Sequence, residues 1–334
     1  MPLLCGTLFI SSSPAAQALD REKIAVIVND NDPLSVKIGR YYAKSRNISP
    51  LNIARISLPH DRPVLSSGDF KQLQKKIFEQ IPKDTQAFVL TWLSPYRVDC
   101  MSITSAFAFG FARRYCATGC RPTAPNPYFD NETGTAYGNF RMRLTMTLAA
   151  ENFEQAKALI DRGVGADFTQ PQGAAYLVVT GDAARDTRAA SFETTQQEFG
   201  YRVPTFIVNA AGIRNRDKVL FYFTGAKHVP YLDSINFVPG AIADHLTSSG
   251  GRLTGSGQMN ALEWLKAGAT GSFGAVVEPC NFPQKFPNPK ILLKHYLNGD
   301  TLIEAYWKSV VWPGQGIFIG EPLSAPFADP VQNS

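Results

Sequence analysis

The sequence lacks the patterns that would place it in several common classes of protein. No run of eighteen or more apolar residues is present, so we expect no membrane span. No Gly-x-Gly-x-x-Gly loop follows the first predicted strand, which argues against a nicotinamide dinucleotide enzyme. The formal net charge of +5 is not gathered into a run of Lys and Arg, so we expect no nucleic-acid partner.

The first eighteen residues also lack any charged side chain. An apolar stretch at residues 3–10 leads through a Ser/Pro segment to Ala16-Gln17-Ala18, and signal peptidase requires such small side chains before its cleavage site. The basic n-region is missing, which an upstream start codon would explain. We therefore expect residues 1–18 to be a signal peptide and the protein to be extracytoplasmic, either periplasmic or secreted. The alternative is a frayed apolar terminus.

Cysteine is scarce, with five residues in the chain, and removal of the expected leader leaves four. An even number in an exported chain predicts two disulfides, formed by Cys100, Cys116, Cys120 and Cys280. Cys116 and Cys120 could close a small ring, while Cys100 and Cys280 could meet across a sheet edge, but three pairings remain open. Zinc is a weaker alternative, because the paired Cys-x-x-Cys spacing of a structural site is absent.

Segments with a strand-like hydrophobic pattern alternate along the chain, after the expected leader, with segments that have a helical pattern. Strands are predicted at residues 23–29, 53–58 and 87–93, with helices at residues 34–45 and 69–80 between them. The continuous apolar run at residues 23–29 is typical of a strand buried on both faces of a parallel sheet. The β-α-β-α-β order therefore predicts an α/β fold with a doubly wound, mostly parallel sheet and helices on both faces.

The same alternation returns after an irregular stretch. Residues 94–150 are rich in Gly, Pro, Asn and aromatic residues and hold three cysteines, so we expect a disulfide-pinned loop insertion there. Residues 19–150 would then form a first α/β half, and residues 151–334 a second half that continues the same sheet. In this second half we predict strands at residues 174–180, 203–209, 219–224, 271–277 and 316–319, and helices at residues 153–162, 189–199, 259–267 and 302–310.

Two aspartates follow the first predicted strand, where open α/β sheets bind ligands at the carboxyl edge. Asp30 and Asp32 form an Asp-x-Asp pair that could hold a hard divalent cation such as magnesium or calcium. No other cofactor is indicated. The alternative interpretation is structural, with Asp30 in a turn and Asp32 as the N-cap of the following helix.

A second candidate cluster lies in PGAIADHLTSSGG at residues 239–251. Asp244 and His245 are adjacent, so their side chains point to different sides of a regular element and each needs a partner from elsewhere. His245 is a candidate base, with Ser248 or Ser249 as the nucleophile on the Gly-rich turn. The alternative is a structural histidine.

A third candidate group follows two later strands. His228 comes after the strand at residues 219–224, and Glu278 and Cys280 come after the strand at residues 271–277. If parallel strands end at one edge, these side chains meet Asp30 and His245 there. That convergence predicts a cleft along the carboxyl edge of the sheet.

Several short strings resemble those of an uncharacterised bacterial family of exported proteins. They are VNDNDPLS at residues 28–35, GRYY at residues 39–42, PGAIA at residues 239–243, AGATGS at residues 267–272, Glu278-Pro279, and GEPL at residues 320–323. The resemblance covers nearly the whole chain after residue 18. That family is in turn distantly similar to the gingipain and caspase clan of cysteine peptidases, whose α/β sheet carries a catalytic His and Cys after two neighbouring strands.

The resemblance implies a caspase-like or gingipain-like fold and can be compared residue by residue. The clan's His follows a strand in a Gly-rich turn, where this chain has FTGAKH ending at His228. The clan's Cys follows the next strand, but residues 234–249 contain no cysteine, and Cys280 lies one strand further on. A thiolate nucleophile needs a base within reach and a thiol outside a disulfide, so peptidase activity is not the favoured expectation.

Two classes of function therefore stay open. The favoured one is a non-peptidase binding or scaffold protein that keeps a peptidase-like sheet. The alternative is a hydrolase at the carboxyl edge of the sheet, either metal-assisted through Asp30 and Asp32 or resembling a cysteine peptidase through His228 and Cys280, or with a hydroxyl in place of the thiol.

Overall fold

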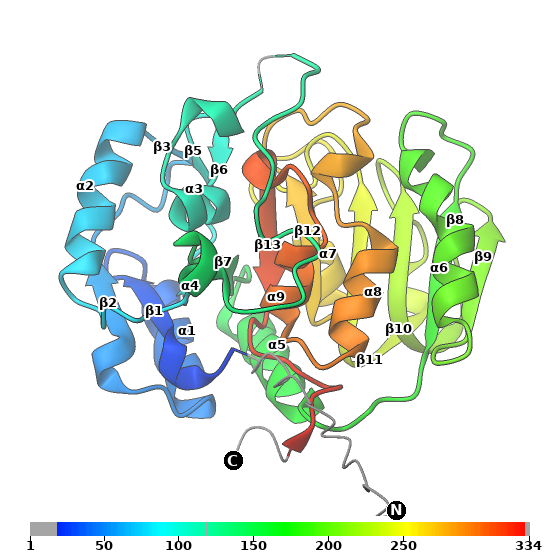
Figure 1. Ribbon diagram of the computed structural model, residues 1–334, viewed down its shortest axis with the longest axis horizontal. Helices are drawn as coiled ribbons and strands as arrows, with labels where there is room; N and C mark the ends of the chain where they lie inside the picture. Colours follow the sequence, from blue (N-terminus) through cyan, green and yellow to red (C-terminus); the bar gives the residue numbers. More distant parts are fainter. Residues whose placement is uncertain (1–18, 118, 331–334) are drawn as a thin grey trace, which may run out of the picture.

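The computed structural model describes residues 19–117 and 119–330, and the expected leader at residues 1–18 lies outside them. Ten strands form one large sheet (Figure 1). Across the sheet the order is β2 (Ile53–Ile56), β1 (Ile24–Asn29), β4 (Ala87–Leu90), β7 (Leu144–Thr147), β13 (Gly316–Gly320), β12 (Gly271–Ala275), β11 (Ile235–Leu246), β10 (Arg216–Gly225), β8 (Ala174–Val179) and β9 (Thr205–Asn209). Several central strands are buried along their whole length, as their continuous apolar runs predict.

The ten strands divide into two sets of opposite direction. Strands β2, β1, β4, β7 and β13 are parallel to one another and are called the first set here. Strands β12, β11, β10, β8 and β9 are likewise parallel and form the second set. The two sets meet where β12 pairs with β13 in antiparallel fashion. The carboxyl ends of the two sets therefore lie at opposite edges of the sheet.

Helices cover both faces of this sheet, which confirms the predicted α/β class. One face carries α1 (Pro33–Ser45), α5 (Phe153–Ala166) and α7 (Ala261–Lys266). The other face, toward the viewer in Figure 1, carries α2 (Ser67–Phe78), α3 (Ile103–Phe109), α6 (Phe192–Phe199), α8 (Pro289–Leu297) and α9 (Leu302–Lys308). No helix among residues 19–117 and 119–330 is both long and apolar enough to cross a bilayer.

The expected loop insertion at residues 94–150 is irregular for most of its length. It holds α3, the short α4 (Ala136–Phe140), and the strands β5 (Arg97–Val98) and β6 (Met101–Ser102). With β3 (Val64–Leu65) these two strands form a small second sheet in the order β3-β5-β6. Its last residues, however, form β7, a fully buried strand in the middle of the main sheet. This strand of four residues was not identified from the sequence, because the loop before it is rich in polar and aromatic residues.

Both predicted disulfides are present, and all four cysteines outside the expected leader take part. Cys100 pairs with Cys116 and Cys120 pairs with Cys280, with Cα–Cα distances of 5.4 and 5.5 Å. The Cys116–Cys120 ring considered from the sequence does not form, nor does a Cys100–Cys280 bond. The Cys120–Cys280 bond joins the irregular stretch to the loop that follows β12.

A buried ion cluster ties the first set to the segment that follows β13. Arg46, at the C-cap of α1, donates to Glu321 through Nε at 2.9 Å and through Nη2 at 2.5 Å, and also pairs with Asp167. The Glu321 side chain is fully buried beneath α5. A carboxylate out of water is tolerated here because the guanidinium forms two parallel hydrogen bonds with it.

Two glycines of α5 test how closely this helix packs on the Glu321 side chain. A Cβ at Gly163 would lie 2.5 Å from Glu321 Cγ, whereas a Cβ at the exposed Gly165 would meet nothing within 4 Å. We expect Gly163→Ala to lower the free energy of unfolding by roughly 1–3 kcal/mol through overpacking. Gly165→Ala is the matched control and should raise it by up to about 1 kcal/mol. Urea denaturation measures both, and equal effects of the two substitutions would contradict the close packing.

Candidate functional site

The carboxyl edge of the second set brings together four loops, which follow β8, β10, β11 and β12. The register pairs Gly225 at the end of β10 with Leu246 at the end of β11. His228 and Ser248 therefore come shortly after the ends of two neighbouring parallel strands. Glu278 follows β12 at the same edge, because β12 is parallel to β11.

The loop after β11 is held by one side-chain amide. Gln258 Oε1 accepts hydrogen bonds from Thr247 Oγ1, Ser249 N and Ser249 Oγ, each at 2.9 Å. The next residue, Met259, donates its N–H to Lys227 O at 3.1 Å and so fixes the loop after β10 against the same segment. The hydroxyls of Thr247 and Ser249 are thereby committed to structure.

The side chains of His228 and Ser248, unlike those of Thr247 and Ser249, do not take part in these structural hydrogen bonds. The His228 side chain is exposed, Ser248 is half-buried, and neither side chain forms a hydrogen bond with another described residue. An imidazole and a hydroxyl are thus both available at the ends of adjacent strands. This is the position at which the sequence comparison expected a base and a nucleophile.

His245 does not reach this edge as a free base, contrary to its proposed catalytic role. Its ring is fully buried against α7, where Nδ1 accepts from Trp264 Nε1–H at 2.9 Å and Nε2 lies 3.1 Å from Met259 O. Nε2 therefore carries the proton, and the lone pair of Nδ1 is occupied. Burial lowers the pKa of His245 to about 4, so the ring is neutral at physiological pH. These contacts match the structural interpretation of this histidine.

Asp244 is also occupied, on the opposite face of β11, as the alternation of a strand requires. Its Oδ1 lies 2.5 Å from Arg188 Nη1, and both side chains are buried. Arg188 also donates to Thr224 O at 2.9 Å and to Pro287 O at 3.2 Å. Burial raises the pKa of Asp244, and Arg188 opposes that rise. The pair holds the loop after β8 onto β10 and β11, and the Asp244 carboxylate is buried away from solvent.

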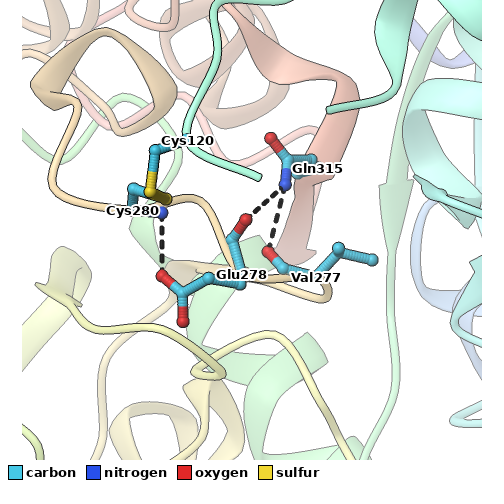
Figure 2. The surroundings of a disulfide bond; sticks show 5 residues. All are labelled: Cys120, Val277, Glu278, Cys280 and Gln315. Carbon is cyan, nitrogen blue, oxygen red and sulfur yellow. Dashed lines mark hydrogen bonds between the residues drawn. A yellow bond between two sulfur atoms is a disulfide. The ribbon is translucent and has the colours of Figure 1, made fainter. Parts of the chain in front are cut away.

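The loop after β12 carries Glu278 and Cys280 (Figure 2). Glu278 is exposed, and its Oε1 accepts from Cys280 N at 2.8 Å, while Gln315 Nε2 donates to Glu278 O at 2.7 Å. The Cys280 sulfur is bonded to Cys120, so the cysteine nearest to His228 in sequence is not a thiolate. A role for Cys280 as nucleophile is incompatible with this bond.

Lys285 adds a buried amine next to this loop. Its Nζ is inaccessible to solvent and has no hydrogen-bond partner in the described part of the chain. Burial lowers the pKa of Lys285 to about 8, although Glu278 opposes the shift. This burial depends on long-range packing that the sequence does not reveal.

Asp30 and Asp32 lie at the opposite edge, so the predicted cleft that joins Asp30 to His228, His245 and Glu278 does not form. The cause is the reversal of direction between β12 and β13. Asp30 pairs with Arg55, and Asp32 caps α1 by accepting from Leu34 N at 2.9 Å. These partners match the turn-and-cap interpretation. In the described ranges no three His, Cys, Asp or Glu side chains are grouped as metal ligands.

Two surface hollows accompany the two edges. A pocket of about 630 Å³ lies between the loop after β2 and α2, and its lining includes Arg55, Arg62, Asp69 and Lys76. A pocket of about 320 Å³ lies at the carboxyl edge of the second set, between the 3₁₀ segments Asp186–Ser191 and Pro283–Lys285 and the start of α8. Its lining includes Thr194, Phe286 and Val311, with the buried Arg188 against its wall. Neither pocket lining was predicted: the first pocket forms between a loop and the helix that follows it, and the second between segments distant in sequence.

Comparison with solved structures places this chain near a peptidase fold. It is similar to the complex of Porphyromonas gingivalis RgpB pro- and mature domains, with a TM-score of 0.50, 10% identity, and coverage of 91% of this chain and 79% of that chain. A structure titled "Structure of Protease" gives a TM-score of 0.50, 9% identity, and coverage of 93% and 80%. No known protein family and no curated protein matches the sequence significantly. The comparisons therefore support a gingipain-like fold, and identities this low show the fold alone.

The state of His245 predicts an acid-dependent loss of stability. Its pKa is about 4 in the folded chain, against about 6.5 when unfolded, so the unfolded chain binds an extra proton between these values. Its contribution is complete above pH 6.5 and is lost as the pH falls toward 4, by roughly 3 kcal/mol in total. His245→Gln can keep both hydrogen bonds without titrating, so we expect it to flatten this dependence. Thermal unfolding from pH 4 to pH 7 measures it, and parallel curves for the two proteins would contradict the assignment.

Proposed function

We propose that this chain is a non-peptidase member of a peptidase-like fold and that it binds a polypeptide segment at the carboxyl edge of the second set. The observation that carries the proposal is that every cysteine within residues 19–117 and 119–330 is held in a disulfide. The loop after β11 offers only hydroxyls at Thr247, Ser248 and Ser249, and Cys280 is held in a disulfide. Without a thiolate, the cysteine peptidase reaction has no nucleophile.

The same edge has features suited to recognition of a polypeptide. The imidazole of His228 and the carboxylate of Glu278 are both exposed there. The pocket of about 320 Å³ opens at the same edge, and apolar and hydroxyl side chains line its wall. One solved structure of similar fold is a complex of RgpB pro- and mature domains. Disulfides persist in oxidising compartments, so we place this binding outside the cytoplasm.

A second candidate function is supported by the free pair at the strand ends. His228 and Ser248 are the imidazole and the hydroxyl without structural partners at this edge in the described part of the chain. A serine hydrolase needs a hydroxyl and a base within hydrogen-bond reach, which rotation of these two side chains would have to provide. A metal-assisted reaction through Asp30 and Asp32 has less support, because both carboxylates already have partners.

Binding and cleavage can be separated with one defined peptide library. We expect the immobilised protein to retain a subset of synthetic peptides and to return them intact, as judged by mass spectrometry. Thr194→Trp fills the pocket from its exposed rim and should reduce retention at least tenfold. Gln197→Trp places the same ring on the exposed side of α6 outside the pocket lining and is the control. Cleaved peptides, or equal retention by both variants, would contradict the proposal.

The serine hydrolase alternative predicts covalent labelling by a fluorophosphonate. If the protein has the proposed binding function, we expect no adduct on the wild-type protein, because no described base is hydrogen-bonded to the Ser248 hydroxyl. An adduct that is lost in both Ser248→Ala and His228→Ala, but kept in Ser256→Ala, would establish the hydrolase instead. Intact-mass measurement of the four proteins decides between the two functions.

A further inference from the structure

Leu19, the first residue that the structure describes, lies in the interior of the fold. The Leu19 side chain is 9% exposed and packs in the main hydrophobic core. Its backbone nitrogen donates to Glu304 Oε2 at 3.1 Å in a buried hydrogen bond. A residue next to an expected cleavage point is therefore anchored at both its side chain and its nitrogen.

The carboxylate of Glu304 is held rigidly on the first turn of α9. The same oxygen, Oε2, accepts from Thr301 Oγ1 at 2.6 Å and from Thr301 N at 3.2 Å, which completes a capping box. The side chain is 7% exposed. Glu304 thus cannot turn toward solvent without breaking the cap, and its charge must be compensated where it lies.

Glu304 forms no ion pair of its own with another described residue. Lys308 is buried but lies 2.6 Å from Asp300, which also meets His295 Nδ1 at 3.2 Å. Two carboxylates, Glu304 and Asp300, therefore share one ammonium. Burial, and next the negative charge of Asp300, raise the pKa of Glu304. A buried carboxylate without its own counter-ion is costly, and a second cation at this point would remove that cost.

We propose that the chain is processed between Ala18 and Leu19, and that the new α-ammonium of Leu19 forms a buried ion pair with Glu304. A peptidase that cleaves after small side chains hydrolyses this peptide bond. Water supplies a hydroxyl to the carbonyl of Ala18 and a proton to the nitrogen of Leu19, and the released amine takes a further proton from solvent. The existing N–H to Oε2 contact becomes a charge-assisted one, and Glu304, Asp300, Lys308 and the amine are then electrically balanced.

This pairing gives the ion pair a defined dependence on pH. An ordinary α-amine has a pKa of about 7.7–8.0, and a carboxylate partner raises it in the folded chain. The stabilisation is therefore complete below about pH 7.7 and is lost as the pH rises through the folded value. The other titratable groups around this point are Asp300, Lys308, Tyr128 and His295, whose Nδ1 lies 3.2 Å from Asp300; Asp20, next in the chain, caps the segment Arg21–Lys23.

The test begins with the full chain expressed with its leader in an exporting host. Mass spectrometry of the N-terminal peptide should find Leu19 as the first residue. Insertion of one Ala between Ala18 and Leu19 preserves the cleavage motif but moves the amine by one residue, about 3.8 Å along the chain. We expect the wild-type exported protein to unfold roughly 2–6 °C higher than this insertion variant at pH 7.

Two further measurements identify the ion pair as the cause. The difference between wild type and insertion variant should shrink as the pH is raised from 7 to 10, and it should vanish when both proteins carry Glu304→Gln. Lys308→Gln serves as the charge control, since removal of this ammonium should leave the difference in place or enlarge it. A different first residue, or equal melting temperatures of wild type and insertion variant across this pH range, would overturn the proposal.

Discussion

The antiparallel pairing of β12 with β13 determines what this sheet can bring together. Each set of parallel strands collects the loops after its own carboxyl ends, so one reversal separates the loops into two groups at opposite edges. His228, Ser248 and Glu278 fall in one group and Asp30 and Asp32 in the other. The fold thus has two candidate surfaces, and side chains on one surface cannot contact a ligand bound at the other.

Local patterns in the sequence were sufficient for most of the elements but not for their direction or for the state of the site. The apolar run at residues 23–29 predicts β1, and Asp32 caps α1 as its position suggests. Strand β11 was not found by periodicity, because Pro239 and Gly240 in its middle resemble a turn. His245 could not be assigned as structural, since its partner Trp264 arrives only when α7 packs on the sheet.

Buried ion pairs connect segments of this protein whose relative position hydrophobic packing alone would not fix. The Arg46–Glu321 pair fixes α1 to the segment after β13, and the Arg188–Asp244 pair fixes the loop after β8 to β11. Removal of one partner from such a pair leaves an uncompensated charge in a medium of low dielectric constant. The Arg188–Asp244 pair therefore restricts the loop after β8 to one arrangement at the carboxyl edge of the second set.

The two disulfides connect cysteines that are consecutive along the chain, Cys100 with Cys116 and Cys120 with Cys280. Because synthesis runs from the N-terminus, Cys100 and Cys116 emerge before Cys120, and Cys120 stays unpaired until Cys280, at a sequence separation of 160, has followed. An oxidant that joins these four thiols in their order of emergence yields both native bonds directly. Such a pattern reduces the need for an isomerase to correct mispaired intermediates.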